Sequence, residues 1–206
     1  RIVDPQARRH GRIVAALARL RRNASLEFGS EDVNTAAHYT WYSSPVGEVF
    51  LTARGGALTG LDLLGRREDR PIPDDWTEGA EVLDAARAQL DAYFEGRSRG
   101  FDLPIQLEGT PFQRRVWGEL CKIPYSRTIS YTELARRVGN PAASRAVGGA
   151  NGRNPIGLIV PCHRVIAADG TLGGYGGGLD RKLWLLQFEA ENLGLDVPES
   201  WSRKLR

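Results

Sequence analysis

A cysteine and a histidine stand side by side in the segment VPCHRV, residues 160–165. A thiol is a nucleophile only as its thiolate, so a reactive cysteine needs a base or a positive charge nearby. Cys162 is followed by both His163 and Arg164. Neighbouring side chains on an extended chain point to opposite faces, so we expect His163 to reach Cys162 only through a turn or a water. The alternative is a buried, unreactive cysteine beside a surface histidine, because free cysteine is among the most buried residue types.

The element that must hold this cysteine is the apolar run 156–160, which only Gly157 interrupts. The run is short enough for a buried strand and too short for a helix. Pro161 ends it, because proline has no backbone N–H with which to continue a ladder. The pattern therefore predicts a thiol at the end of a rigid strand.

A carboxylate that can orient the histidine lies on the last predicted helix, residues 180–191. Leucine and aromatic residues give this helix a broad apolar face, and Glu189 lies beside that face. One interpretation is a solvated acid at the helix edge. The other is a relay in which Glu189 orients His163 and His163 activates Cys162, as nucleophile, base and orienting acid.

Three helices are predicted before the cysteine. Thr110 caps the first, which runs to about Cys121, and Ser130 opens the second, which ends at Gly139. A Gly-Asn-Pro turn then leads into the third, residues 142–152. Two short helices joined by a tight turn are the helix-turn-helix pattern, in which the second helix is presented to DNA.

The helix at 142–152 is built mostly from small residues, with Arg145 as its one long side chain. Each glycine inside a helix costs roughly 1 kcal/mol relative to alanine, so a compensating contact is expected. That contact is either close packing against another helix or close approach to a nucleic-acid groove with Arg145 inserted. The basic surroundings favour the second interpretation.

A glycine run with one tyrosine, residues 173–178, follows the cysteine segment. Glycine leaves the backbone free of side chains, so such a loop is either flexible or brought close to a flat ligand. Both interpretations stay open on composition alone.

The first half of the chain carries different patterns. Residues 1–36 predict a basic extension of unknown role, with a short amphipathic helix. Residues 39–64 alternate in polarity with two turns, which predicts a three-stranded meander. A helix follows, with Thr77 as its expected cap and Gly96 at its end. We predict an N-terminal domain at 37–100 that serves as a scaffold, a connection at 101–108, a catalytic and DNA-binding domain at 109–192, and a tail at 193–206.

Charge is distributed unevenly along the 206 residues, although the net charge is only +3. Residues 111–206 carry fourteen Lys or Arg against eight Asp or Glu. This excess of positive charge favours the binding of a polyanion by that segment. No apolar run is long enough for a membrane span. The two cysteines are expected to be free thiols, and with three scattered histidines they form no zinc-binding pattern.

Several motifs in a fixed order then resemble one family, the O6-alkylguanine-DNA alkyltransferases, also called methylated-DNA-protein-cysteine methyltransferases. They are GTPFQ at 109–113, VW at 116–117, ISY at 129–131, GNP at 139–141, RAVG at 145–148, NP at 154–155, IVPCHRV at 159–165 and GGY at 173–175. The match is dense from 109 to 189 and looser from 39 to 108, while residues 1–36 lie outside it.

The resemblance implies an α+β fold with a small N-terminal sheet-and-helix domain and a mostly helical C-terminal domain. The latter contains a helix-turn-helix or winged-helix-like DNA-binding unit. It also implies a single-turnover DNA repair protein that rotates an O6-alkylguanine out of the duplex and takes the alkyl group irreversibly onto Cys162. Base flipping is required because a protein thiol cannot align for in-line displacement while the base stays stacked.

The resemblance also implies roles for individual residues. His163 would be the base, acting through a water, and Glu189 would polarise it. Tyr131 would donate a proton toward the guanine ring and crowd the rotating phosphate, Asn154 would brace the active-site turn, and Arg145 would fill the gap in the stack. The carbonyls of Cys162 and Val165 would accept from the guanine amino group. Further DNA-facing positions would be Ser130, Ala142, Ala143, Gly148 and Asn151, and the pocket would also include Tyr175, Gly176, Gly177 and Lys182.

No cofactor and no metal are expected. Some relatives hold zinc in the N-terminal domain, but this chain has no ligands for it there. Gly176 stands where some relatives have a hydroxyl residue, so the loop offers only a backbone donor to O6. The expected partner is double-stranded DNA containing O6-alkylguanine, bound by a monomer, with cooperative clustering left open. No membrane is expected, and the compartment is the cytoplasm, at the nucleoid in a prokaryote, or the nucleus in a eukaryote.

Two competing functions remain. A Cys-His thiol hydrolase would use the same relay to form an acyl-enzyme and would turn over. A non-catalytic lesion-binding protein of the alkyltransferase-like kind would lack the acceptor cysteine, and Cys162 argues against it.

Overall fold

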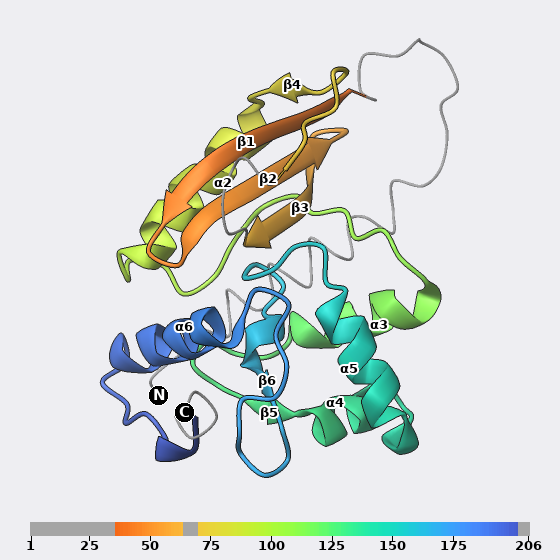
Figure 1. The fold of residues 1–206 in the computed structure, drawn as a ribbon, viewed down its shortest axis with the longest axis vertical. Coiled ribbons are helices and arrows are strands. Elements are labelled where there is room, and N and C mark those ends of the chain that lie inside the picture. The colour runs from red at the N-terminus through yellow and green to blue at the C-terminus, as the bar shows by residue number, and fades with distance from the viewer. Residues whose placement is uncertain (1–35, 64–69, 202–206) are drawn as a thin grey trace, which may run out of the picture. The chain divides into compact units, whose positions relative to one another are not determined.

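The computed structural model describes residues 36–63 and 70–201 (Figure 1). The basic helix expected within 1–36 lies outside the described residues, except for position 36.

The N-terminal part is a four-stranded sheet in the order β3-β2-β1-β4. Strands β1 (Ala37–Ser44), β2 (Gly47–Arg54) and β3 (Ala57–Leu63) pair antiparallel as the predicted meander. Glycines with positive φ make the two turns, at Gly47 (φ 105°) and at Gly55 and Gly56 (φ 61° and 70°). Positive φ strains residues that carry a Cβ, so glycine is the residue suited to these turns.

The fourth strand, β4 (Thr77–Glu78), was not predicted, and Thr77 does not cap the following helix. It pairs parallel with β1 through His38. Gly79 fixes this edge, because its N–H donates to the Tyr39 carbonyl at 2.8 Å and its own carbonyl lies 2.9 Å from His38 Nδ1. The helix begins only after this pairing ends, with Ala80 at the N-cap and no side-chain cap.

Helix α2 (Glu81–Phe94) runs along one face of the sheet (Figure 1). The buried residues of this helix are spaced three or four positions apart, so they lie on one face. It packs with inward residues of β2 and β3 into the main hydrophobic core. The buried residues of the helix are Leu83, Ala86, Leu90 and Tyr93.

The C-terminal part is mostly helical, which confirms the predicted fold class. Helix α3 (Pro111–Leu120) opens with a full capping box between Thr110 and Gln113. Helix α4 (Tyr131–Arg137) is capped by the Ser130 hydroxyl, which accepts from Glu133 N at 3.0 Å. The helix-turn-helix partner begins as a 3₁₀ turn, η2 (Pro141–Ala143), and continues as α5 (Ser144–Gly152).

The last elements begin with the turn that contains the cysteine. The 3₁₀ turn η3 (Cys162–Arg164) leads into β6 (Val165–Ile166), which pairs parallel with β5 (Ile129–Ser130). Helix α6 (Leu179–Glu191) and the short turn η4 (Glu199–Trp201) complete the described chain.

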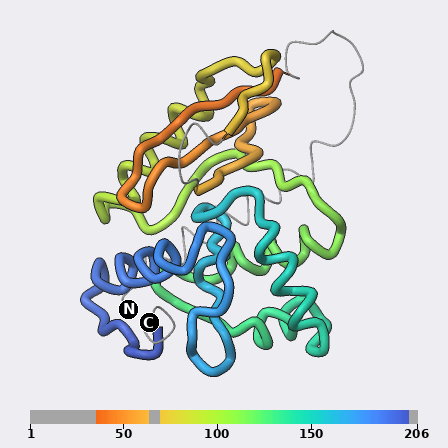
Figure 2. Tube along the Cα trace, in the orientation of Figure 1, coloured from red at the N-terminus to blue at the C-terminus, as the bar shows by residue number. Residues whose placement is uncertain are grey.

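The strand predicted at 156–160 is wrong. The segment leaves α5 and coils tightly before the cysteine (Figure 2). Its backbone bonds are mostly local: Val160 N donates to the Ile156 carbonyl at 2.9 Å, and Leu158 has a positive φ of 65°. Only Ile156 makes a β-bridge, to Leu61. The apolar side chains are buried as expected, so the pattern reported burial correctly and the backbone shape incorrectly.

Candidate active site

Cys162 is the first residue of η3, and this residue is 7% exposed at the wall of a pocket of about 490 Å³. Burial raises the pKa of the Cys162 thiol, because a thiolate loses hydration there. An unaided thiol at this position is therefore a poor nucleophile near neutral pH. The site needs a group that removes the proton.

Two asparagines hold the backbone around the cysteine. Asn154 Nδ2 donates to the Val160 carbonyl at 2.7 Å, and its Oδ1 accepts from Ile156 N at 3.1 Å. Asn151 Nδ2 lies 3.4 Å from the Cys162 carbonyl. Asn151 Oδ1 is buried, lies in a pocket-lining residue and has no hydrogen-bond partner among the described residues. The pocket therefore contains an acceptor that is paired with none of the described residues.

His163 lies on the inner side of the same turn and is fully buried. Its Nε2 is 2.9 Å from Glu189 Oε1, and its Nδ1 has no hydrogen-bond partner within the described chain. Burial lowers the pKa of His163, although the negative charge of Glu189 opposes that shift. A neutral imidazole with one free nitrogen is a group able to accept a proton.

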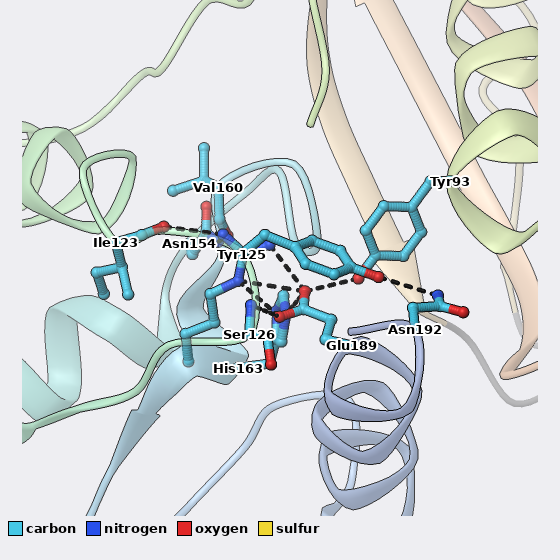
Figure 3. A network of polar contacts seen from close by, with 10 residues as sticks. Tyr93, Ile123, Tyr125, Ser126, Asn154, Val160, His163, Glu189 and Asn192 are labelled. Carbon is cyan, nitrogen blue, oxygen red and sulfur yellow. Dashed lines mark hydrogen bonds and ion pairs between the residues drawn. The ribbon is translucent and has the colours of Figure 1, made fainter. Parts of the chain in front are cut away.

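Glu189 is the centre of a buried network (Figure 3). Its carboxylate accepts from Arg164 Nη2 at 2.8 Å and Arg164 Nε at 3.0 Å, from Tyr93 Oη at 2.7 Å and from Ser126 N at 2.8 Å. Burial alone would raise the pKa of Glu189, but His163 and Arg164 outweigh it and hold the pKa well below its usual range. The acid is a buried anion, not a solvated one at a helix edge.

Arg164 was expected to supply positive charge near the thiol, and the structure directs it elsewhere. Its guanidinium binds Glu189, donates to the Ile123 carbonyl at 2.8 Å and lies over the Tyr125 ring at 5.5 Å. Sequence reasoning did not find Tyr93 or Ser126 as partners of Glu189. No local pattern marks Tyr93, which is 96 positions away, whereas the positive φ of Ser126 (56°) is visible only in the folded backbone.

Tyr131 and residues of the glycine run also line the pocket. Tyr131 Oη donates to the Gly174 carbonyl at 3.1 Å, and burial raises the pKa of its phenol. Gly173 has φ +68°, and a Cβ there would lie 2.9 Å from the Tyr131 ring. A Cβ on Gly177 would lie 2.8 Å from the Tyr175 ring. The loop is therefore packed closely, and glycine is required where it passes the two rings.

Lys182 holds this loop in place through hydrogen bonds to backbone carbonyls. Its fully buried ammonium donates to the carbonyls of Val165 at 2.6 Å, Leu172 at 2.5 Å and Gly174 at 3.2 Å. Burial lowers the pKa of Lys182 to about 8. Lys182 thus shapes the pocket without lining it.

The structure brings most of the expected site residues together. Tyr131, Gly148, Asn151, Asn154, Cys162, Tyr175, Gly176 and Gly177 all line the pocket. Arg145 and Ala142 are exposed and Ala143 is half-buried, outside the pocket lining. Leu61, Asp62, Leu63 and Arg70 of the N-terminal part also line the pocket, which sequence reasoning missed.

Within the described ranges, no group of three or more His, Cys, Asp or Glu side chains is placed to hold a metal ion. Among the helices described, none is both long and apolar enough to cross a membrane.

Comparison with known proteins gives a consistent result. Residues 37–107 match the family model for 6-O-methylguanine DNA methyltransferase, ribonuclease-like domain, and residues 111–191 match the model for its DNA binding domain. The methylated-DNA–protein-cysteine methyltransferase of Methanosarcina barkeri is 47% identical over 156 residues, covering 76% of this chain and 99% of that protein. The protein of the same name from Mycobacterium tuberculosis is 47% identical over 160 residues, covering 78% and 96%.

Solved structures agree. The crystal structure of Mycobacterium tuberculosis OGT in complex with DNA matches with a TM-score of 0.69 and 47% identity, covering 75% of this chain and 94% of that one. A structure of the O6-methylguanine methyltransferase of the same organism matches with a TM-score of 0.67 at 44% identity.

Proposed function

The chain belongs to the 6-O-methylguanine DNA methyltransferase family, and on that premise we propose that it repairs O6-alkylguanine in double-stranded DNA by moving the alkyl group onto Cys162. The position of Cys162 supports its role as the alkyl acceptor. Cys162 lines a pocket that is also lined by Tyr131 and by residues of the closely packed glycine loop. Such walls suit a flat base.

The chemistry is a displacement at the alkyl carbon. His163 Nδ1 takes the thiol proton through a bridging water, and the sulfur attacks the carbon attached to O6. A carbon–sulfur bond forms as the carbon–oxygen bond breaks, and the electron pair passes to the guanine. Tyr131 donates a proton toward the guanine ring. The thioether is stable, so each molecule reacts once.

Glu189 acts by orienting His163 and stabilising its imidazolium. His163 Nε2 donates to Glu189 Oε1 at 2.9 Å, which directs Nδ1 away from the acid. Asn154 supports the same step by bracing the backbone that carries the cysteine.

Recognition of the base uses the carbonyls of Cys162 and Val165, which accept from the guanine amino group, and the loop at Tyr175, Gly176 and Gly177. The buried bond from Lys182 to the Val165 carbonyl keeps that acceptor in place. A carbonyl has two lone pairs, so it can receive both donors.

DNA is held by the helix-turn-helix. Exposed Arg145 enters the stack where the damaged base has left it, and Ser130, Ala142, Ala143, Gly148 and Asn151 provide further contacts to the DNA. The small side chains let the α5 backbone approach the duplex closely. The protein acts as a monomer in the compartment that holds the DNA, and molecules can cluster on long duplexes.

The test is an intact-mass measurement after exposure to an oligonucleotide carrying O6-methylguanine. One methyl adduct on Cys162, with Cys162→Ala unmodified, is the expected result. A Cys-His hydrolase would instead turn over without lasting modification of the thiol. An unmodified protein beside an intact lesion rejects the proposal.

A further inference from the structure

The N-terminal part of the chain contributes one hydroxyl to the catalytic network. Tyr93, near the end of α2, is fully buried, and its Oη donates to Glu189 Oε1 at 2.7 Å. The two residues are 96 positions apart. Sequence patterns predicted only a scaffold for this half.

The oxygen that Tyr93 contacts is the one that faces the histidine. Glu189 Oε1 accepts from Tyr93 Oη and lies 2.9 Å from His163 Nε2, whereas Oε2 accepts from Ser126 N and Arg164 Nε. Arg164 also reaches Oε1 through Nη2 at 2.8 Å. Tyr93 and His163 therefore share a single carboxylate oxygen.

The Tyr93 ring is held on several sides. It stacks on Phe101 at 5.2 Å between ring centroids, lies 5.6 Å from Phe188, and meets Tyr125 edge-on at 5.9 Å. A ring packed in this way fixes the direction of its hydroxyl before substrate arrives.

We propose that Tyr93 is a positioning residue for alkyl transfer, which holds Glu189 Oε1 against His163 and disperses part of its negative charge. The inference rests on the proposed function of Cys162. It makes the N-terminal half part of the chemical step as well as a scaffold.

The charged groups around His163 and Glu189 decide whether loss of the Tyr93 hydroxyl raises or lowers the pKa of His163. His163 faces Glu189, with Arg164 and Lys182 as further charges, and Glu189 faces Arg164, Tyr93 and Tyr125. Without the Tyr93 hydroxyl, Oε1 carries more charge and favours the imidazolium. The neutral base then forms only at higher pH.

The experiment is the single-turnover rate of methyl transfer between pH 5 and 9, for the wild type, Tyr93→Phe and Tyr125→Phe. Tyr125 is a matched control because it lies in the same aromatic cluster, but its hydroxyl accepts from Asn192 Nδ2 at 3.0 Å. In the plot of transfer rate against pH, we expect the acidic limb of Tyr93→Phe to lie about 0.5–1 pH unit higher than that of the wild type. At any pH on that limb, transfer by the variant should then be about 3–10-fold slower. Tyr125→Phe should keep the wild-type limb.

A second replacement covers the case in which Tyr93→Phe does not fold. Incorporating 3-fluorotyrosine at position 93 retains the ring and makes the phenol a stronger donor, so the acid limb should move down. An unchanged limb in both Tyr93 variants, or an equal shift in Tyr125→Phe, overturns the inference. Failure of the wild type to form any Cys162 adduct is a different result, because it rejects the proposed function itself.

Discussion

Glu189→Gln removes the negative charge at the centre of the buried network while keeping the shape of the side chain. The carboxylate meets donors at both oxygens: Tyr93, His163 and Arg164 at Oε1, and Ser126 and Arg164 at Oε2. An amide has one acceptor and one NH₂ group, so either orientation directs hydrogens against existing donors. It also leaves the Arg164 guanidinium buried without a counter-charge.

The size of the effect follows from burial. Removing one partner of a buried ion pair costs about 3–5 kcal/mol, because the other charge stays desolvated. We therefore expect Glu189→Gln to lower the free energy of unfolding by that amount in urea titrations at pH 7. Loss of the group that orients the base should also slow methyl transfer by about 10²-fold or more.

Lowering the pH should reduce the difference in stability between the wild type and Glu189→Gln. The folded pKa of Glu189 lies below its usual value of 4.5, so the carboxylate stabilises the fold above that pH and loses its contribution as the pH falls further. The gap in stability between the wild type and Glu189→Gln should therefore narrow from pH 5 toward pH 3.

Glu133→Gln is the matched control. Arg136 and Arg137 lower the pKa of Glu133 to about 2, yet these pairs lie at the surface, where solvent screens them. Its urea midpoint should stay close to that of the wild type. The reasoning is refuted if the free energy of unfolding of Glu189→Gln lies within about 1 kcal/mol of the wild-type value, because breaking a buried ion pair should cost more than that. If the single variant does not fold, adding Arg164→Met should recover stability without recovering transfer.

Three further outcomes are expected. Arg145→Ala should slow transfer from duplex DNA but leave reaction with the free modified base largely intact, because insertion exists only in a stack; equal loss on both substrates would show a structural role. Gly173→Ala should destabilise the protein by about 1–3 kcal/mol through its positive φ, measured by urea unfolding. Gly174→Ala is its control, because a Cβ at position 174 would have no atom within 4 Å. An equal loss of stability in both variants would contradict the argument. Lys182→Met leaves three carbonyls without their donor and should cost at least about 1–3 kcal/mol while slowing transfer from duplex and free base alike; transfer at the wild-type rate would show that the loop holds without it.

Local patterns predicted much of the helical half correctly. The capping box at Thr110 and the Ser130 cap formed as expected, because both depend on residues within one turn of the chain. The run 156–160 is where the local pattern gave the wrong backbone shape. Its apolar residues are buried, but burial alone does not distinguish a strand from a tight turn.

The sequence by itself determined which residues could carry the chemistry, since Cys162 and His163 are adjacent and the surrounding motifs occur in a characteristic order. Only the tertiary structure decided what Glu189 contacts. Arg164 turned from the thiol to this acid, and Tyr93 reached it from the other half of the chain. Such contacts depend on side-chain directions set by the packing of elements far apart in sequence, which no local periodicity records.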